Sequence, residues 1–173
     1  MMCVKVLKCL IVSLIFQEVS CGAQIHWINC STSDPSHFKF ATCNLRNFKK
    51  SDAQFSCYVQ VLEPIRDCMV RLETLYLVGR KPIVLLNASC DACELLKNRK
   101  RFVAVSRMFD IIADKTNLNH TCPYAHNIFA NNLTLDLHKF PFPMPRGKYY
   151  MKVSFFVNRD TNKVYVEGAA TIF

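Results

Sequence analysis

Apolar and polar residues alternate along much of the chain, which is the pattern of strands that bury one face. The alternation is clearest in residues 55–61 and 68–74, and the turn-forming segment 63–67 separates the two. We expect these two strands to pair as a hairpin. Residues 81–87 carry a continuous apolar run, which predicts a short buried strand. Further strands are predicted at residues 25–30, 38–48, 128–137, 149–158 and 164–173.

Between residues 91 and 115 the apolar residues no longer alternate with polar ones but recur every three or four residues. Phe102, Val105, Phe109 and Ile112 recur at helical spacing with charged residues between them, so we expect helices at 91–97 and 102–115. Residues 140–147 hold prolines at alternate positions, which predicts an extended segment unfit for a central strand. The chain therefore predicts a mainly β fold, a β-sandwich or open β-cup, with a two-helix insertion.

The N-terminal 22 residues have the layout of a secretory signal peptide. Lys5 and Lys8 precede the apolar run 10–16, and small residues follow around positions 20–23. The run is too short to span a bilayer, and no later stretch is long enough. The expected mature protein is one secreted domain, residues 23–173. Export excludes most intracellular enzyme classes and argues against a nucleic-acid partner.

The formal charge of the whole chain is +9. For a secreted protein this favours anionic membranes, glycans or acidic partners. The densest basic run includes Lys97, Arg99 and Arg101. It is typical of a solvated helix end, and the alternatives are a contact for an anionic headgroup or a dibasic protease site.

Glycosylation sequons and cysteines agree with an extracellular location. Each acceptor has the form Asn-x-Ser/Thr without a central proline, and the four are Asn29, Asn87, Asn119 and Asn132. Seven cysteines remain after residue 22: Cys30, Cys43, Cys57, Cys68, Cys90, Cys93 and Cys122. An odd number leaves one thiol free or bonded to another chain, and spacing alone does not fix the pairing.

Motifs for catalysis or metal binding are weak. Cys90 and Cys93 form a C-x-x-C, but no βαβ pattern surrounds it. His120, Cys122 and His126, with Cys93, lack the spacing of a structural zinc site. Asp136 and His138 have no nucleophile tied to them by a motif, and no Gly-x-Ser-x-Gly occurs. We assign no catalytic residue, metal or cofactor, and we do not expect an enzyme.

Several segments together resemble a known family. They are Ile28-Asn29-Cys30, residues 40–45, residues 91–98, Asn117-Leu118-Asn119-His120-Thr121-Cys122-Pro123-Tyr124, and Phe142-Pro143-Met144-Pro145-Arg146-Gly147-Lys148-Tyr149-Tyr150. In this order and spacing the chain resembles a large insect family of small secreted proteins, mostly without assigned function, that includes the chemosensory CheB proteins. That family looks distantly similar to the ML lipid-recognition proteins and the ganglioside activator, which are β-cups that hold acyl chains or sterols.

The resemblance implies a non-catalytic binder of a lipid-like or pheromone-like ligand, with a receptor or ion channel as a further partner. The candidate pocket residues, which core packing explains equally well, are Phe109, Ile112, Phe140, Phe142, Tyr149, Met151 and Phe155. The alternative is a filled-core interaction protein that acts through its surface on a receptor or reproductive partner. A weaker alternative is a secreted hydrolase.

The resemblance also implies two disulfides. They are Cys30–Cys43, expected across the first hairpin, and Cys93–Cys122, expected to tie the helices to the following strand. Cys57, Cys68 and Cys90 depart from the family pattern. Because Cys57 and Cys68 share the apolar phase of the two strands predicted to pair, we expect a third bond between them, which leaves Cys90 odd.

Overall fold

A computed structural model describes residues 22–47, 53–79, 81–134, 136–137, 140, 144–158 and 162–173. The signal peptide predicted for residues 1–22 lies outside this range except for Gly22, as do Phe142 and His138. Within the described residues the strands are β1 (Ala23–Thr32), β2 (Phe38–Asn47), β3 (Ala53–Val61), β4 (Cys68–Val78), β5 (Lys81–Asp91), β6 (Ile128–Thr134), β7 (Gly147–Val157) and β8 (Asn162–Ile172).

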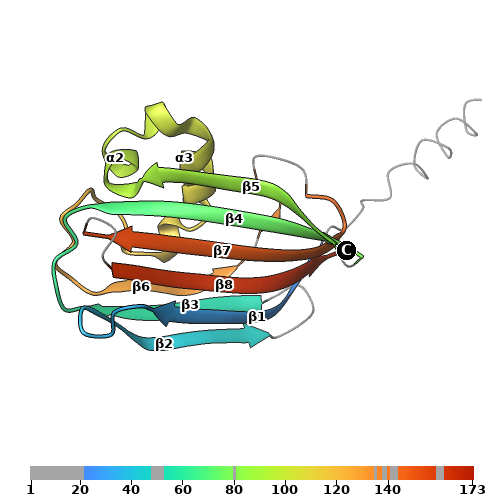
Figure 1. Ribbon diagram of the computed structural model, residues 1–173, viewed down its shortest axis with the longest axis horizontal. Coiled ribbons are helices and arrows are strands. Elements are labelled where there is room, and N and C mark those ends of the chain that lie inside the picture. The colour runs from blue at the N-terminus through green and yellow to red at the C-terminus, as the bar shows by residue number, and fades with distance from the viewer. Residues whose placement is uncertain are drawn as a thin grey trace, which may run out of the picture.

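Two antiparallel sheets form the body of the protein. The larger sheet has the order β1-β8-β7-β4-β5, and the smaller has the order β2-β3-β6. Figure 1 shows β4, β5, β7 and β8 as one layer above β2 and β3. Val157 and Val164 of the larger sheet pack with Phe38 and Val59 of the smaller one, so these side chains define the inward faces. The predicted two-sheet, mainly β fold is confirmed.

The predicted hairpin between residues 55–61 and 68–74 is wrong. β3 pairs with β2 and β6, whereas β4 pairs with β5 and β7. Residues 62–67 carry the chain from one sheet to the other, and Ile65 in this connection forms an isolated bridge with Tyr124. Both strands show the alternation because each buries one face, although in different sheets.

The prediction that residues 81–87 form a short buried strand is also wrong. β5 extends to Asp91 and pairs with β4 at the edge of the larger sheet. Ile83 and Val84 are 49% and 62% exposed. An edge strand has a neighbour on one side only, so its apolar residues are less covered than those of a central strand.

The helical insertion lies where the sequence predicts it. It comprises α2 (Ala92–Lys97), a 3₁₀ turn (Arg99–Phe102), α3 (Val103–Asp110) and a second 3₁₀ turn (Ala113–Lys115). Asp91 caps α2, because its Oδ1 accepts a hydrogen bond from the Glu94 N–H at 2.9 Å. Figure 1 shows α2 and α3 beside the end of β5 where the strand arrow ends. No helix in the described ranges is long and apolar enough to cross a membrane.

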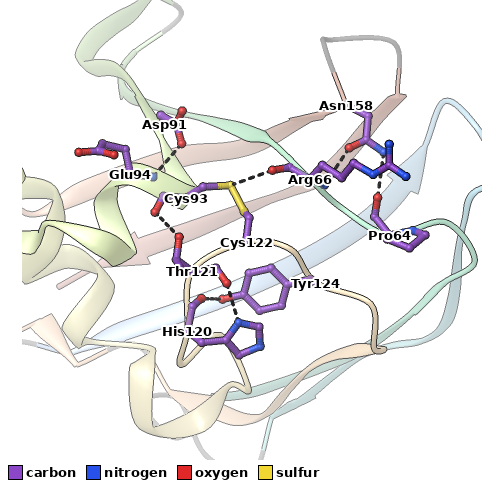
Figure 2. Close-up of a disulfide and its surroundings, with 10 residues drawn as sticks. All are labelled: Pro64, Arg66, Asp91, Cys93, Glu94, His120, Thr121, Cys122, Tyr124 and Asn158. Carbon is purple, nitrogen blue, oxygen red and sulfur yellow. Dashed lines mark hydrogen bonds between the residues drawn. A yellow bond between two sulfur atoms is a disulfide. The ribbon is translucent and has the colours of Figure 1, made fainter.

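Two disulfides are present, Cys30–Cys43 and Cys93–Cys122. Cys30–Cys43 joins the two sheets rather than two strands of one hairpin, since β1 and β2 lie in different sheets. Cys93–Cys122 ties α2 to the segment before β6 (Figure 2). The expected Cys57–Cys68 bond is wrong: both residues are free cysteines, and the strands that carry them do not pair.

Candidate functional site

The inward face of the larger sheet is built from rows of residues that register across its strands. On the central strand β7 the inward positions are Tyr149, Met151, Val153, Phe155 and Val157. Tyr149 and Val157, near the two ends, are buried to 1% and 2% exposure. The three positions between them are only half-buried. This is the reverse of a filled sandwich, in which the middle of the central strand is the best-covered place.

The two rows that cross Met151 and Val153 show the same partial burial from one edge of the sheet to the other. We call them the middle rows. Their register is given by the pairing of β1, β8, β7, β4 and β5. Thr74 is buried to 2%, and the other members are half-buried, namely Ile28, Gly168, Met151, Leu86, Cys30, Val166, Val153, Leu72 and Ala88. A half-buried inward side chain borders space that solvent can reach.

Toward one end of the larger sheet, the inward face carries a buried cluster around Tyr149. Its ring packs with Ala23 and Ile172, and Tyr76 lies beside it with ring centroids 5.2 Å apart. The Tyr149 hydroxyl donates to the Pro145 carbonyl at 2.6 Å. Tyr149 was a candidate pocket residue, and the structure places it in this buried cluster rather than in the half-buried middle.

The opposite end of this face carries a larger cluster from both sheets and the loops. Phe38, Val59, Val157 and Val164 pack together, and Tyr124 joins them from the segment after the helices. The backbone of Tyr124 exchanges two hydrogen bonds with Ile65, each 2.9 Å long. Buried clusters therefore lie toward both ends of the inward face of the larger sheet, and the partly covered positions lie between them.

The remaining pocket candidates fall into three groups. Met151 and Phe155 share the inward face of β7, as the alternation of this segment predicts. Phe109 and Ile112 belong to the helical insertion, where the Arg99 guanidinium lies 5.4 Å from the centre of the Phe109 ring. Phe140 is half-buried in a segment that is described only in part. The structure thus places Met151 and Phe155 on one face of β7, with Phe155 packed against the cluster of Phe38 and Val157, and leaves Phe109 and Ile112 in a separate element.

Sequence reasoning missed most of the middle rows. Leu72, Val153 and Val166 had a usable signal, because each lies in the inward phase of an alternating strand. Ile28 and Leu86 were harder to assign, since a register shift interrupts each of their strands. Alternation identifies a face, whereas the row that a residue joins depends on pairing between distant strands.

The basic candidates are largely engaged by neighbours. Arg99 forms an ion pair with Asp110 and donates to the Ser106 carbonyl at 3.3 Å. Arg101 lies 3.9 Å from Glu94. Lys97 is exposed in the last turn of α2. An open hollow on the helical insertion is lined by Arg99, Lys100, Val103, Ser106, Arg107 and Asp110.

The geometry of Cys90 and Cys93 does not support thiol redox chemistry. Cys93 is bonded to Cys122, so Cys90 and Cys93 do not form a C-x-x-C disulfide. Cys90 is buried, and burial raises the pKa of its thiol, with the nearby Asp91 carboxylate adding to the effect. A raised pKa leaves less of the reactive thiolate near neutral pH.

The four predicted sequons all carry exposed asparagines. Asn29 lies on the outward face of β1 and donates to Glu167 at 3.4 Å. Asn87 lies on β5, and Asn132 lies on β6 with a positive φ of 49°. Asn119 precedes the disulfide-bonded Cys122. Each position is therefore accessible to a glycan.

This chain matches one family model and is similar to solved structures of other proteins. A family model described as "Protein of unknown function (DUF1091)" matches residues 70–151, which run from β4 to the middle of β7. A search of curated proteins found no match. The crystal structure of chicken MD-1 complexed with lipid IVa is similar at 10% identity and a TM-score of 0.38, over 87% of this chain and 97% of that chain. A likeness this distant carries no argument about function. The resemblance to the insect family stays a prediction.

Proposed function

We propose that this chain is a secreted, non-catalytic protein that binds a hydrophobic ligand between its two sheets. One observation carries the proposal: the inward side chains of the middle rows stay half-buried, although the inward face of the larger sheet carries buried clusters on both sides of them. An apolar molecule that covers these side chains removes their surface from water, at about 25 cal/mol per Å².

The chemistry of the middle rows favours an acyl chain, a sterol or a hydrocarbon. Ile28, Leu72, Val153 and Val166 offer aliphatic surface, and Met151 is adaptable in shape. Thr74 is the one residue of these rows with a hydroxyl. A site with many apolar groups and few polar ones suits a ligand whose polar group is small or remains at the rim.

A headgroup contact is best placed at Lys97. Arg99 and Arg101 already face Asp110 and Glu94, which neutralises part of their charge. An exposed lysine can reach an anionic group on a lipid or on a membrane surface at little cost in desolvation. Secretion is supported by the signal-peptide layout and the two disulfides.

The first test fills the proposed space from the edge strand. Ala88 faces inward in the row of Leu72, and the next residue, Ser89, is exposed on the outward face. Both positions belong to the predicted sequon at Asn87, so both variants are made in an Asn87→Gln background that lacks this acceptor. In this background we expect Ala88→Trp to abolish uptake of the fluorescent apolar probe N-phenyl-1-naphthylamine, and the matched Ser89→Trp to retain it. Equal uptake by both variants would place the probe outside the sandwich.

A second test identifies the ligand class. The protein is purified without detergent from a eukaryotic secretory host, and its native mass is corrected for glycans and disulfides. We expect a non-covalent adduct of a few hundred daltons that is lost on denaturation. If the native mass is clean and the delipidated protein takes up no fatty acid, sterol or hydrocarbon, the proposal fails.

The alternative function, surface interaction with a receptor or another protein, is favoured by a different observation. The end of the β4–β5 hairpin exposes large apolar side chains, which are Leu77, Val78, Ile83, Val84 and Leu85. Exposed apolar clusters often mark protein interfaces. Val84→Glu should weaken binding to a protein partner and leave probe uptake unchanged. Ala88→Trp should abolish probe uptake and leave binding to the partner unchanged. A chemosensory receptor or ion channel is the partner class that the family resemblance suggests.

A further inference from the structure

Two histidine rings meet in the segment between the helices and β6. The Nε2 atoms of His120 and His126 lie 3.0 Å apart. His120 stacks on the ring of buried Tyr124 with centroids 4.3 Å apart, and His126 meets the same ring edge-on at 5.4 Å. Figure 2 shows His120 beside the Tyr124 ring, in the loop that continues to the Cys122 disulfide. Tyr124 therefore orients both imidazoles.

The proton of neutral His120 is fixed by its neighbour. Its Nδ1 lies 2.6 Å from the Thr121 carbonyl oxygen, a contact drawn in Figure 2. A carbonyl oxygen only accepts hydrogen bonds, so Nδ1 carries the proton. In the neutral ring Nε2 is then a bare lone pair, and it points toward His126.

The Nδ1 atom of His126 has an acceptor and a donor beside it. The Asn127 carbonyl oxygen lies 2.9 Å away, and Nδ2 of Asn117 lies 3.1 Å away. The Asn117 amide has two N–H groups, one for the Asn127 oxygen at 2.7 Å and one for His126 Nδ1. In the metal-free protein Asn117 therefore donates to His126 Nδ1, and the Nε2–H of His126 donates to the bare Nε2 of His120 at 3.0 Å.

If the His126 proton moves from Nε2 to Nδ1, where the Asn127 carbonyl accepts it, both Nε2 lone pairs face one cation. We propose that His120 and His126 form a binding site for a divalent first-row transition cation, such as Zn²⁺ or Cu²⁺. Imidazole nitrogen is a preferred ligand of these ions. A ligating histidine usually donates its other N–H to a carboxylate, a backbone carbonyl or water, and each ring here has a backbone carbonyl oxygen within 2.9 Å of Nδ1.

The site has two protein ligands and further open positions. In the described part of the chain, no group of three or more His, Cys, Asp or Glu residues could hold a metal ion. Cys122, which lies between these histidines in the sequence, is consumed by its disulfide with Cys93. Water, or a donor from a partner, completes the coordination of the cation.

The backbone around the two rings is held in place before any cation binds. The disulfide fixes Cys122, and the paired backbones of Ile65 and Tyr124 fix the middle of the loop. The Asn127 side chain accepts from the Val61 N–H at 3.0 Å and donates to the Tyr58 hydroxyl at 2.8 Å. Binding therefore costs little ordering of the chain.

The test uses the disulfide-intact protein without a histidine tag, dialysed against EDTA and titrated with ZnCl₂ and separately with CuCl₂. We expect one cation per chain by calorimetry. His120→Ala and His126→Ala should each weaken binding by at least ~10-fold. His26→Ala is the matched control, because His26 is exposed on β1 and its Nε2 contacts Thr171 Oγ1 at 2.7 Å. Zinc should raise the melting temperature of the unchanged protein and of His26→Ala, but not that of His120→Ala or His126→Ala.

Long-range ¹H–¹⁵N spectra separate the cation site from a simple histidine pair. In the metal-free protein we expect a proton on Nε2 of His126 and none on Nε2 of His120, and zinc should remove that proton and shift both resonances. A proton on one Nε2 that zinc does not displace would mean a neutral hydrogen bond between two imidazoles and would overturn the proposal. Equal zinc affinity in all three variants would also overturn it, since the cation would then bind elsewhere.

Discussion

The environment of Cys68 disfavours ionisation of its thiol. It packs against the core cluster of Phe38 and Val157. Burial raises its pKa from 9.0 to about 12, and Asp91, Asp67 and Cys90 add to the effect. Because the folded state raises this pKa, its contribution to stability is complete below pH 9 and is lost as the pH rises toward 12.

We therefore expect Cys68 to react slowly with iodoacetamide near pH 8 in the native protein and rapidly in urea. Cys68→Ser should flatten the fall in unfolding free energy between about pH 8 and about pH 10.5. The measurement is a series of urea titrations of the two proteins across this range. Identical slopes in both would show that Cys68 does not titrate differently on folding.

For the candidate site residues, the sequence predicts which face of a strand a side chain lies on better than it predicts how deeply that side chain is buried. The alternation of β7 places Tyr149, Met151 and Phe155 on one face, and the structure agrees. It does not reveal that Tyr149 is sealed in a cluster while Met151 is half-buried. That difference comes from Ala23 and Ile172, which reach Tyr149 from β1 and β8 through long-range pairing.

At the scale of elements, the Cys30–Cys43 disulfide links two sheets that share no backbone ladder. It closes a loop between cysteines 13 residues apart, for which the chain-entropy estimate is about 3 kcal/mol. We expect the double variant Cys30→Ser/Cys43→Ser to lose close to this amount in urea unfolding. A loss well under about 1 kcal/mol would mean that side-chain packing alone holds the sheets together.

The elements with local signals were predictable, and their partners were not. The helices and the β7–β8 hairpin follow from helical spacing and from a short turn-forming connection. β3 and β4 have equally clear alternation, yet residues 62–67 send them to different sheets. The apolar run in β5 predicts burial, but its place at the edge of the sheet leaves Ile83 and Val84 exposed. Local periodicity does not encode which strand lies alongside.

At the scale of the whole molecule, the proposed site depends on five strands in register, from Ile28 on β1 to Leu86 and Ala88 on β5. These residues are separated by most of the domain, so they meet only when the larger sheet is complete. A ligand that covers the middle rows therefore binds the folded state and not the unfolded chain. Binding energy then appears directly as stability.

We expect a saturating apolar ligand to raise the free energy of unfolding by about 2.7 kcal/mol at 100 times its dissociation constant. The rise should follow the logarithm of ligand concentration in thermal melts. Ala88→Trp should show no such rise, because the indole occupies the space of the ligand, and Ser89→Trp should follow the unchanged protein. A ligand that stabilises Ala88→Trp as strongly as Ser89→Trp must bind the outer surface. In that case, the exposed apolar end of the β4–β5 hairpin becomes the place to look for it.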